Sequence, residues 1–563
     1  MDLEDIKTTE TWELYLKGQN FMRQLHIFTD TDKNYRMFSG NQWEGAKIEG
    51  IENAQYNFIE TIVNYKVSTI NQNLYTINYS SENYEKKIFY KTAEETCKLL
   101  NRKAGKVWEK DQMDYKIRVL SEDSCVNDEG IMYVNYDTET QSPVNEIISK
   151  NNIQYGNENN PDIQSQPYII LSKRVAVKEL KEQLQAEGKE TKYIVGDTEN
   201  YEQAGQSAKQ EKDPMCTIVT KLWKEKGKVH YSKATKYVDI VKDENTDLTL
   251  YPVAHFNWKE KKGSARGEGE VRYLIPNQLE LNKTLARMLL STKQNAYPTK
   301  IVNIEKISNP SAINQVGGVI KVSGGASVDD VNKVFNTIAP AQMSQDVAKT
   351  MSDLIGITRE LKNSSEIATG GINPEDASGK AILAVQQASQ QPMTKQLIGL
   401  KMCIEDIARI WLDMWVTYTP EGMKLEETET DPETGEKSTT IKQVPASVLE
   451  KLKASVKIDI SPTSPYDKYA REMSLENLFK AGYFNPQKLG ELKLYAEALP
   501  DDSVMPKQDL LNIIEREEEE QRKIAEINAQ AQEMMQRASA FINSDIDSQA
   551  EQINDAQQGI SAY

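Results

Sequence analysis

The stretch NPEDASGKAILAVQQASQQPMTKQLIGLKMCIEDIARIWLDMWVTY, residues 373–418, predicts the element around which the chain is organised. It opens with Asn373-Pro374, an N-cap residue followed by proline at the first helical position. Pro392 lies inside the stretch and predicts a kink. Apolar residues recur at alternating steps of four and three, which is typical of one helix face: Met393, Leu397, Leu400, Ile404, Ile407, Trp411, Met414 and Tyr418. We therefore expect a long kinked helix, called the spine helix here.

At about 1.5 Å per residue the spine helix would be about 65 Å long, which favours an elongated subunit. Its apolar stripe is also typical of a helix that is simply buried in a core. Charged residues lie off the stripe at i,i+4 spacing, and they predict the ion pairs Lys401–Glu405, Glu405–Arg409 and Arg409–Asp413.

The chain is acidic and long enough for several domains. It has 563 residues, of which 38% are hydrophobic, and a formal net charge of −17. This charge argues against a protein that holds nucleic acid by its overall field, although a local basic patch remains compatible with it. The N-terminus lacks the pattern of a signal peptide, and no stretch has the apolar length of a membrane span. The four cysteines have no paired spacing and predict reduced thiols in a cytosolic protein, not disulfides or a zinc site.

The first half of the chain predicts helices followed by strands. Residues 1–30 predict an amphipathic helix, and YRMFSGNQWEG at 35–45 predicts a turn held by large apolar side chains. Two further helices are expected at 51–76 and 92–116. Short alternating runs then predict strands at 116–120, 130–136, 166–175, 213–235 and 249–260. We also expect a hairpin turn at 224–228, an Asn-rich loop at 151–162 and a charged helical insertion at 178–213. Together these runs indicate an α+β fold.

The second half predicts a different order. A segment with glycines at 263, 267 and 269 leads to a helix at 271–296, followed by short strands with glycine pairs at their turns. A second apolar stripe after Pro340 predicts another helix, and a polar, glycine-rich loop at 363–373 precedes the spine helix. Beyond it we expect a polar hairpin at 424–444, a strand at 456–460, a helix from Tyr466 and a long charged helix from Pro506. That last helix carries the stripe Ile524, Ile527, Ala531, Met534, Ala538 and Phe541.

The segment at 35–45 resembles a signature of tailed-bacteriophage portal proteins, the head–tail connectors of the portal vertex. The matching residues are Tyr35, Arg36, Phe38, Gly40, Gln42 and Trp43. A second similarity is the Ser-Gly pair, Ser378 and Gly379, near the start of the spine helix. The order of helix, small β module, helix, loop and long kinked helix is similar to the stem, clip, stem, tunnel loop and wing of that family.

This resemblance implies an α+β, predominantly helical portal fold with wing, stem, clip and crown, in an elongated subunit of a ring. The expected parts are an N-terminal wing part at 1–270, a first stem helix at 271–297, a clip at 298–340, a second stem helix at 341–362, a tunnel loop at 363–373, the spine helix and the rest of the wing at 374–500, and a crown helix with the C-terminal tail at 501–563.

The resemblance also implies a function. Portal proteins form a ring, expected here to be a dodecamer, which is the channel for double-stranded DNA at one capsid vertex. The terminase large subunit packages the genome through it, head–tail adaptor proteins replace the terminase, and the major capsid protein surrounds the ring. We therefore expect a virion protein, assembled in the host bacterial cytoplasm, with no cofactor and no membrane. An acidic subunit suits this task, since a sliding duplex cannot be held by many phosphate contacts.

Two sets of residues are candidates for these contacts. The channel and tunnel-loop candidates are Lys349, Arg359, Lys362, Asn363, Ser364, Ser365, Gly370 and Gly371. The clip candidates for terminase or adaptor contact are Glu305, Lys306, Gly317 and Gly318. For each cation, a solvated helix face is an equally compatible interpretation.

The sequence offers no catalytic or metal constellation. The three histidines are far apart in sequence. Gly379-Lys380 does not fit a phosphate-binding loop, because Pro374 and Ala381 occupy positions that require Gly and Ser or Thr. This argues against an enzyme or a nucleic-acid-dependent ATPase. The alternative is another phage structural protein without a DNA channel, such as a head–tail adaptor or a scaffold. Adaptors are usually shorter, and scaffolds lack a β module between paired helices.

Overall fold

The computed structural model describes residues 7–44, 53–72, 74–80, 87–189, 191–197, 214–297, 299–315, 319–323, 335–338, 345–364, 391–419, 422–430, 437–444, 457–463 and shorter stretches between 474 and 536. The chain divides into two units, Met1–Leu425 with Ile441–Pro462, and Glu426–Thr440 with Thr463–Tyr563. The candidate site lies in the first unit.

Five helices and one strand begin the first unit: α1 (Glu10–Gln24), α2 (Ile27–Phe38), α3 (Phe58–Ile70), β1 (Leu74–Ser80), α4 (Lys87–Lys110) and α5 (Met113–Asn127). The expected single helix at 1–30 is two helices, because His26 adopts a left-handed φ of 58° between α1 and α2. The turn in the 35–45 segment follows at Gly40, whose φ is +87°, so Tyr35 and Phe38 belong to the end of α2.

One prediction in this region was wrong, and one predicted helix was too long. Residues 116–120 form part of α5, not a strand, because Met113, Ile117 and Leu120 are buried on one face at helical spacing. The helix expected at 51–76 covers only Phe58–Ile70, and the chain continues as β1.

Two antiparallel sheets follow. The first has the order β3-β2-β9 and comprises β2 (Glu129–Asp137), β3 (Ser142–Ile148) and β9 (Val253–Asn257). The second runs in chain order and comprises β4 (Ile153–Tyr155), β5 (Tyr168–Ala176), β6 (Met215–Glu225), β7 (Lys228–Ala234) and β8 (Asp239–Asn245). Short 3-10 turns lie at η2 (Lys150–Asn152) and η3 (Ile163–Ser165), and α6 (Val177–Ala186) follows β5. The predicted hairpin turn is confirmed between β6 and β7, where Lys226 and Gly227 have positive φ.

The faces of the second sheet have different neighbours. Trp12 and Tyr15 of α1 pack on Ile170 and Val219 on one face. On the opposite face, Leu171 and Leu222 pack in the main core, and residues of the first sheet belong to the same core.

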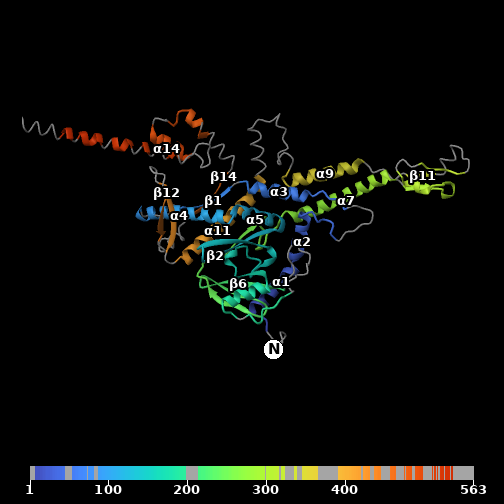
Figure 1. Ribbon diagram of the computed structural model, residues 1–563, viewed down its shortest axis with the longest axis horizontal. Helices are drawn as coiled ribbons and strands as arrows, with labels where there is room; N and C mark the ends of the chain where they lie inside the picture. Colours follow the sequence, from blue (N-terminus) through green and yellow to red (C-terminus); the bar gives the residue numbers. More distant parts are fainter. Residues whose placement is uncertain are drawn as a thin grey trace, which may run out of the picture. The chain divides into compact units, whose positions relative to one another are not determined.

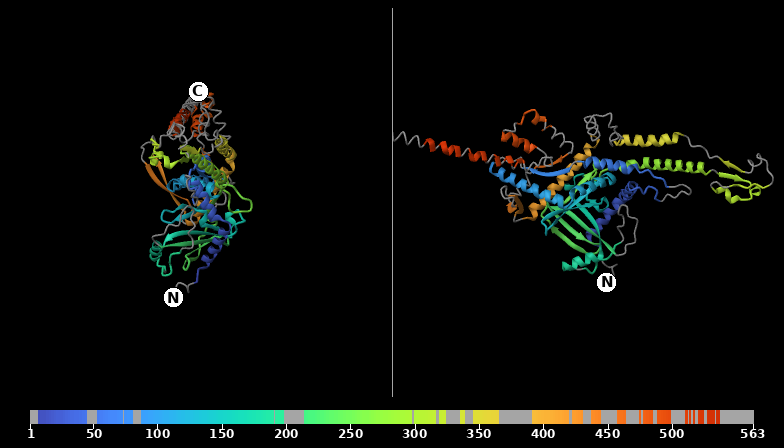
Figure 2. Two further views of the ribbon diagram at one scale, coloured as in Figure 1. Left: turned by 90° about the vertical axis from the view of Figure 1, so that its right-hand side faces the viewer. Right: turned by 45° about the horizontal axis from the view of Figure 1, so that its top comes forward.

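In the segment after the sheets, the described residues form two helices and a small β module. These elements are α7 (Val271–Ala296), β10 (Thr299–Val302), η4 (Ile304–Lys306), η5 (Pro310–Asn314), β11 (Phe335–Ile338) and α9 (Gln345–Leu361). The bounds of α7 are those predicted. β10 and β11 pair antiparallel, with Thr299 opposite Ile338. α7 and α9 lie side by side (Figures 1 and 2), and Asn277 Nδ2 donates a 3.0 Å hydrogen bond to Thr358 Oγ1 between them.

The described part of the spine helix is α11 (Thr394–Tyr418), which follows a 3-10 turn, η6 (Gln391–Met393). Its predicted stripe is confirmed: Leu400, Ile404, Ile407, Trp411 and Met414 are all buried in the main core. Pro392 lies in the turn before the helix, while the expected helix at 374–390 lies outside the described residues. The predicted Glu405–Arg409 pair is confirmed at 3.6 Å. Arg409 also pairs with Asp406, and Asp413 accepts hydrogen bonds from Thr249 and Leu250.

Further along the described chain lie β12 (Met423–Thr430), β13 (Lys437–Val444), β14 (Lys457–Thr463) and α14 (Leu489–Ala498). β12 and β13 pair, which confirms the hairpin expected at 424–444, and β14 pairs with β1. In the second unit, the described residues between 510 and 536 are helical, and all of those from 516 onward are exposed.

Candidate functional site

Helix α7 carries two buried amides on its apolar face. Gln278 and Asn282 lie one turn apart among Leu274 and Leu281, and all four side chains are buried. Gln278 Oε1 accepts a hydrogen bond from the backbone N–H of Phe58 at 3.2 Å, and Gln278 Nε2 donates to Asn282 Oδ1 at 2.9 Å. Since Phe58 begins α3, Gln278 satisfies one of the free N–H groups at the start of that helix.

The 35–45 segment reaches the same amides. Asn282 Nδ2 donates to Gln42 Oε1 at 2.6 Å, and Gln42 Nε2 donates to Asn57 Oδ1 at 2.9 Å. We call Gln42, Asn57, Gln278 and Asn282 the amide cluster. Trp43 Nε1 donates to the carbonyl of Ala54 at 2.9 Å. Two residues of the predicted motif therefore hold the end of α2 and the start of α3 together, and one of them bonds to α7.

The other motif residues have local roles. Arg36 pairs with Asp32 at 2.9 Å and with Glu44 at 3.0 Å on the surface. Tyr35 is exposed, and Phe38 packs against the main core. The remaining pair, Ser378 and Gly379, lies outside the described residues.

The glycine segment before α7 is fixed to the first sheet. A Cβ atom on Gly267 would lie 2.7 Å from Asn257 Oδ1, so only glycine fits there without a shift. Arg266 pairs with the buried Glu129 on β2, and its Nε lies 3.0 Å from Glu158 Oε2. Burial alone would raise the pKa of Glu129, but the Arg266 guanidinium and His255 lower it to about 2. α7 thus leaves the sheet layer from a rigid, ion-paired base.

The predicted channel residues lie along α9 and at its end. Lys349 is exposed and Arg359 is half-buried, and neither has a carboxylate partner among the described residues. Lys362 differs, because its Nζ lies 2.7 Å from the buried Glu270 Oε1. Asn363 has a left-handed φ of 54°, and Ser364 is buried. The predictions at Ser365, Gly370 and Gly371 lie outside the described residues.

The predicted clip residues lie on the small β module. Glu305 and Lys306 are exposed on η4, whereas Gly317 and Gly318 lie outside the described residues. Large apolar side chains beside them are also exposed: Ile301, Ile304 and Val319. Apolar side chains interspersed with charges are typical of a surface that contacts another protein.

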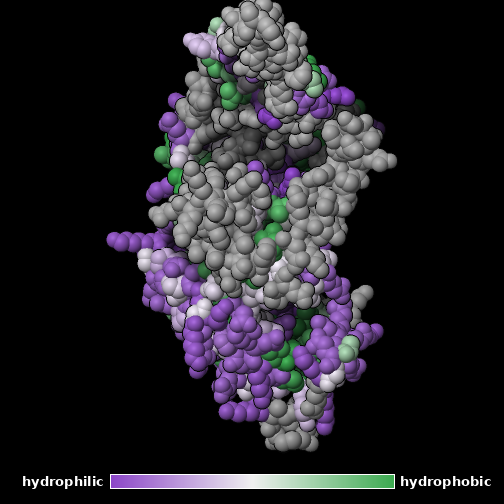
Figure 3. Space-filling view, turned by 90° about the vertical axis from the view of Figure 1, so that its left-hand side faces the viewer, coloured by the Kyte–Doolittle hydropathy of each residue, from purple (hydrophilic) through white to green (hydrophobic). Residues whose placement is uncertain are grey.

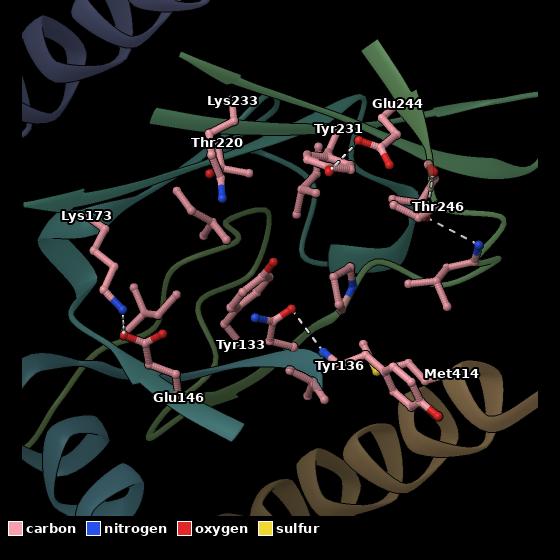
Figure 4. Close-up of a pocket in the computed structure, with 18 of the residues that line it drawn as sticks. Tyr133, Tyr136, Glu146, Lys173, Thr220, Tyr231, Lys233, Glu244, Thr246 and Met414 are labelled. Atoms are coloured by element: carbon pink, nitrogen blue, oxygen red, sulfur yellow. Dashed lines mark hydrogen bonds and ion pairs between the residues drawn. The ribbon is translucent and has the colours of Figure 1, made fainter. Parts of the chain in front are cut away.

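A cleft of about 690 Å³ lies between the two sheets and α11 (Figure 4). Tyr133, Leu171 and Met414 line its interior. Its labelled charged groups are largely paired, since Lys173 lies 2.6 Å from Glu146 and Tyr231 donates to Glu244 at 2.7 Å. Its described lining residues include no histidine or cysteine.

The described residues show neither a metal centre nor a membrane-spanning helix. Within the described part of the chain, no three His, Cys, Asp or Glu side chains come together as metal ligands. Among the same residues, no helix has the length and apolar character needed to cross a bilayer. The space-filling view shows a mostly hydrophilic described surface with small hydrophobic areas between (Figure 3).

Sequence reasoning missed Glu270, Gln278 and Asn282. The signal for the two amides was present, because polar residues at i,i+4 interrupted an otherwise apolar helix face. Glu270 had the signal of an acidic residue directly before a helix.

The family model described as Phage P22-like portal protein matches residues 19–561. The match includes the 35–45 segment, both sheets, α7, the β module, α9 and α11. The search of curated proteins found no match to the chain.

Proposed function

The chain belongs to the family of P22-like phage portal proteins, and we propose which of its parts form the DNA channel and its docking surfaces. A portal protein is a structural component of the virion, where it forms a homo-oligomeric ring at one capsid vertex. Terminase packages the genome through this ring, and the DNA later leaves by the same channel. The match over residues 19–561 is the observation that carries the function.

We assign α7 and α9 to the stem and the module between them to the clip. The support is their arrangement: two helices pack side by side, and the small β10–β11 module joins their ends (Figure 1). On this assignment the stem helices are 271–297 and 341–362, and the clip is 298–340. The wing comprises 1–270 and 374–500, and the crown is 501–563. The ring is a dodecamer assembled in the host bacterial cytoplasm.

The proposed DNA contacts are few. Lys349 and Arg359 lack carboxylate partners among the described residues and lie on α9, which leads to the proposed tunnel loop at 363–373; Arg359 is in its last turn. Lys362 is less accessible to phosphate, because its side chain is only 19% exposed and contacts Glu270. In a chain with a net charge of −17, two cations per subunit position a duplex without gripping it.

The clip is the proposed docking surface. Glu305 and Lys306 supply exposed charges beside Ile301 and Ile304, which suits contact first with the terminase large subunit and then with head–tail adaptors. The protein has no catalytic role in this scheme, and the terminase supplies the chemical work.

Negative-stain imaging of the purified protein tests the proposal. We expect rings with a central hole, and a compact monomer at assembly concentrations would contradict it. Shortening the loop at 363–373 by several residues should leave rings intact but reduce DNA retention in particles. Cross-linking from Ser365 to packaged DNA would place the loop at the channel, whereas a loop on the outer wall would refute that placement.

A further inference from the structure

Glu270, the N-cap residue of α7, is surrounded by three lysines from different parts of the chain. Its side chain is 1% exposed. Lys66 of α3 lies 3.2 Å from Oε2, Lys259 after β9 lies 3.1 Å from Oε2, and Lys362 after α9 lies 2.7 Å from Oε1. We call these four residues the Glu270 cluster. One carboxylate therefore joins three segments that are distant in sequence.

The carboxylate is held in its charged form. Burial alone would raise the pKa of Glu270, but Lys66 and Lys362 lower it to about 2. Burial also lowers the pKa of Lys66, which Glu270 opposes. Since one carboxylate faces three ammonium groups, removing it would leave the buried Lys66 without its partner in this cluster.

Lys362 has a second contact in the same place. Its Nζ lies 5.1 Å from the centroid of the Tyr273 ring, and Lys259 Nζ lies 5.1 Å from it as well. Tyr273 is on the first turns of α7 and donates a hydrogen bond to Glu268. The side chain of Lys362 is accordingly only 19% exposed, although lysines at helix ends usually point into solvent.

The backbone at Lys362 ends α9 in a defined way. The N–H of Ser364 donates to the carbonyl of Arg359 at 2.9 Å, and the N–H of Asn363 donates to the carbonyl of Glu360 at 3.0 Å. With Asn363 at a left-handed φ of 54°, these bonds form a Schellman motif whose C-cap is Lys362. The ion pair to Glu270 thus connects the C-cap of α9 to the N-cap of α7, at the point where the 363–373 segment begins.

We propose that Glu270 is a positioning residue for the 363–373 segment, and that it acts through Lys362 by holding the end of α9 against the start of α7. This inference rests on the proposed function, in which that segment is the tunnel loop. A loop that surrounds DNA at a fixed position along the channel needs a fixed first residue. Among the described residues, only the ion pairs of the Glu270 cluster connect the start of this segment to the buried core.

Hydrogen exchange on assembled full-length rings tests the proposal, with Lys362→Met as the main variant and Lys259→Met as the matched control. Lys362→Met removes the α9 arm of the cluster, and it should increase exchange of amides 358–364 by about tenfold or more because the helix end is no longer held. Lys259→Met removes another arm of the same carboxylate and should leave those amides at the wild-type rate. Lys362→Arg keeps the charge and should restore protection, and Glu270→Gln should behave like Lys362→Met.

The functional readout is DNA retention in particles that carry each variant. We expect retention to fall for Lys362→Met and to return with Lys362→Arg. Wild-type exchange and retention in Lys362→Met would overturn the proposal, and so would an equal effect from Lys259→Met, because the cluster would then serve general stability only. Should Glu270→Gln fail to fold, the Lys362 variants still decide, since Lys362 is more exposed. Failure of the proposed function would be seen separately, as an absence of rings in the wild-type protein.

Discussion

Asn282 Nδ2 donates a 2.6 Å hydrogen bond to Gln42 Oε1, although 240 residues separate the two in sequence. Both side chains are buried, so each depends on the other to satisfy its polar atoms. Gln42 therefore bonds both to a helix far along the chain and to the local turn, where its Nε2 donates to the carbonyl of Met37 at 3.0 Å.

Replacing Gln42 with alanine should destabilise the chain by about 1–3 kcal/mol, because Asn282 Nδ2 loses its acceptor in a buried place. Urea unfolding should show a lower midpoint at an unchanged slope. The neighbouring exposed Asn41→Ala is the control and should cost less than about 0.5 kcal/mol. The double variant Gln42→Ala/Asn282→Ala should couple by at least about 0.5 kcal/mol, and strictly additive effects would contradict the direct bond.

Long periodic elements were predictable from the sequence. The bounds of α7 and the buried stripe of α11 follow from apolar residues at helical spacing over many turns. The β6–β7 hairpin follows from its glycine turn. In each of these cases, neighbours along the chain determine the structure.

Features that depend on distant partners were not predictable. Ile117 and Val119 alternate with polar residues as in a strand. In the structure, however, Ile117 is buried with Met113 and Leu120 on one face of the helix α5. The break between α1 and α2 requires a left-handed conformation at His26, which the residue type alone does not predict. The Glu270 cluster combines α3, the β9 loop and the end of α9, so no local window contains it. The ion pair between Lys362 and Glu270 could not be predicted for the same reason, because the two residues lie far apart along the chain.

Acid should reveal the buried pair of Glu129 and Arg266. The pKa of Glu129 is about 2 in the folded chain against a usual value of 4.5, so its stabilising contribution is complete above pH 4.5 and is lost as the pH falls toward 2. Glu129→Gln should cost about 3–5 kcal/mol at neutral pH, since it leaves Arg266 short of a counter-charge. It should also reduce the slope of stability against pH in that window by up to about 1.4 kcal/mol per pH unit.

Denaturant unfolding at a series of pH values measures both effects of Glu129→Gln. The control is Glu146→Gln, which breaks the exposed pair with Lys173 and should cost under about 1 kcal/mol. A slope equal to the wild type's between pH 4.5 and 2 would show that Glu129 does not carry this pH dependence.

Reversing the clip charges should separate assembly from docking. Glu305→Lys combined with Lys306→Glu changes exposed residues only, so rings should form as in the wild type. Packaging or adaptor attachment should fall at least about tenfold, because like charges across an interface lower the association rate. Particle DNA content and tail joining are the measurements. Normal values for both would move the docking surface away from η4.

Removing residues from Glu515 onward should leave the rest of the chain folded. All described residues from 516 to 536 are exposed, including Ile524, Ile527 and Met534, while the last large buried residue before the cut, Ile514, is retained. Circular dichroism should show a melting temperature within about 2 °C of the full chain, with a loss of helical signal from the removed part. An unfolded or insoluble product would mean that this helix belongs to the core and not to a crown.

Neutralising the two unpaired cations of α9 should weaken DNA binding without affecting assembly. Lys349 is exposed and Arg359 half-buried, and no carboxylate among the described residues compensates either, so Lys349→Gln/Arg359→Gln removes two phosphate-attracting charges from each subunit. The binding of rings to a short duplex should then depend less on salt, with the slope of log K against log salt falling by about 0.9 for each phosphate that is no longer neutralised. Lys226→Gln, on the exposed β6–β7 turn, is the matched control and should leave the slope unchanged.

Because many subunits repeat the change around one channel, particles with the double variant should also retain less DNA. If the slope and retention both match the wild type's, these two side chains do not contact the duplex.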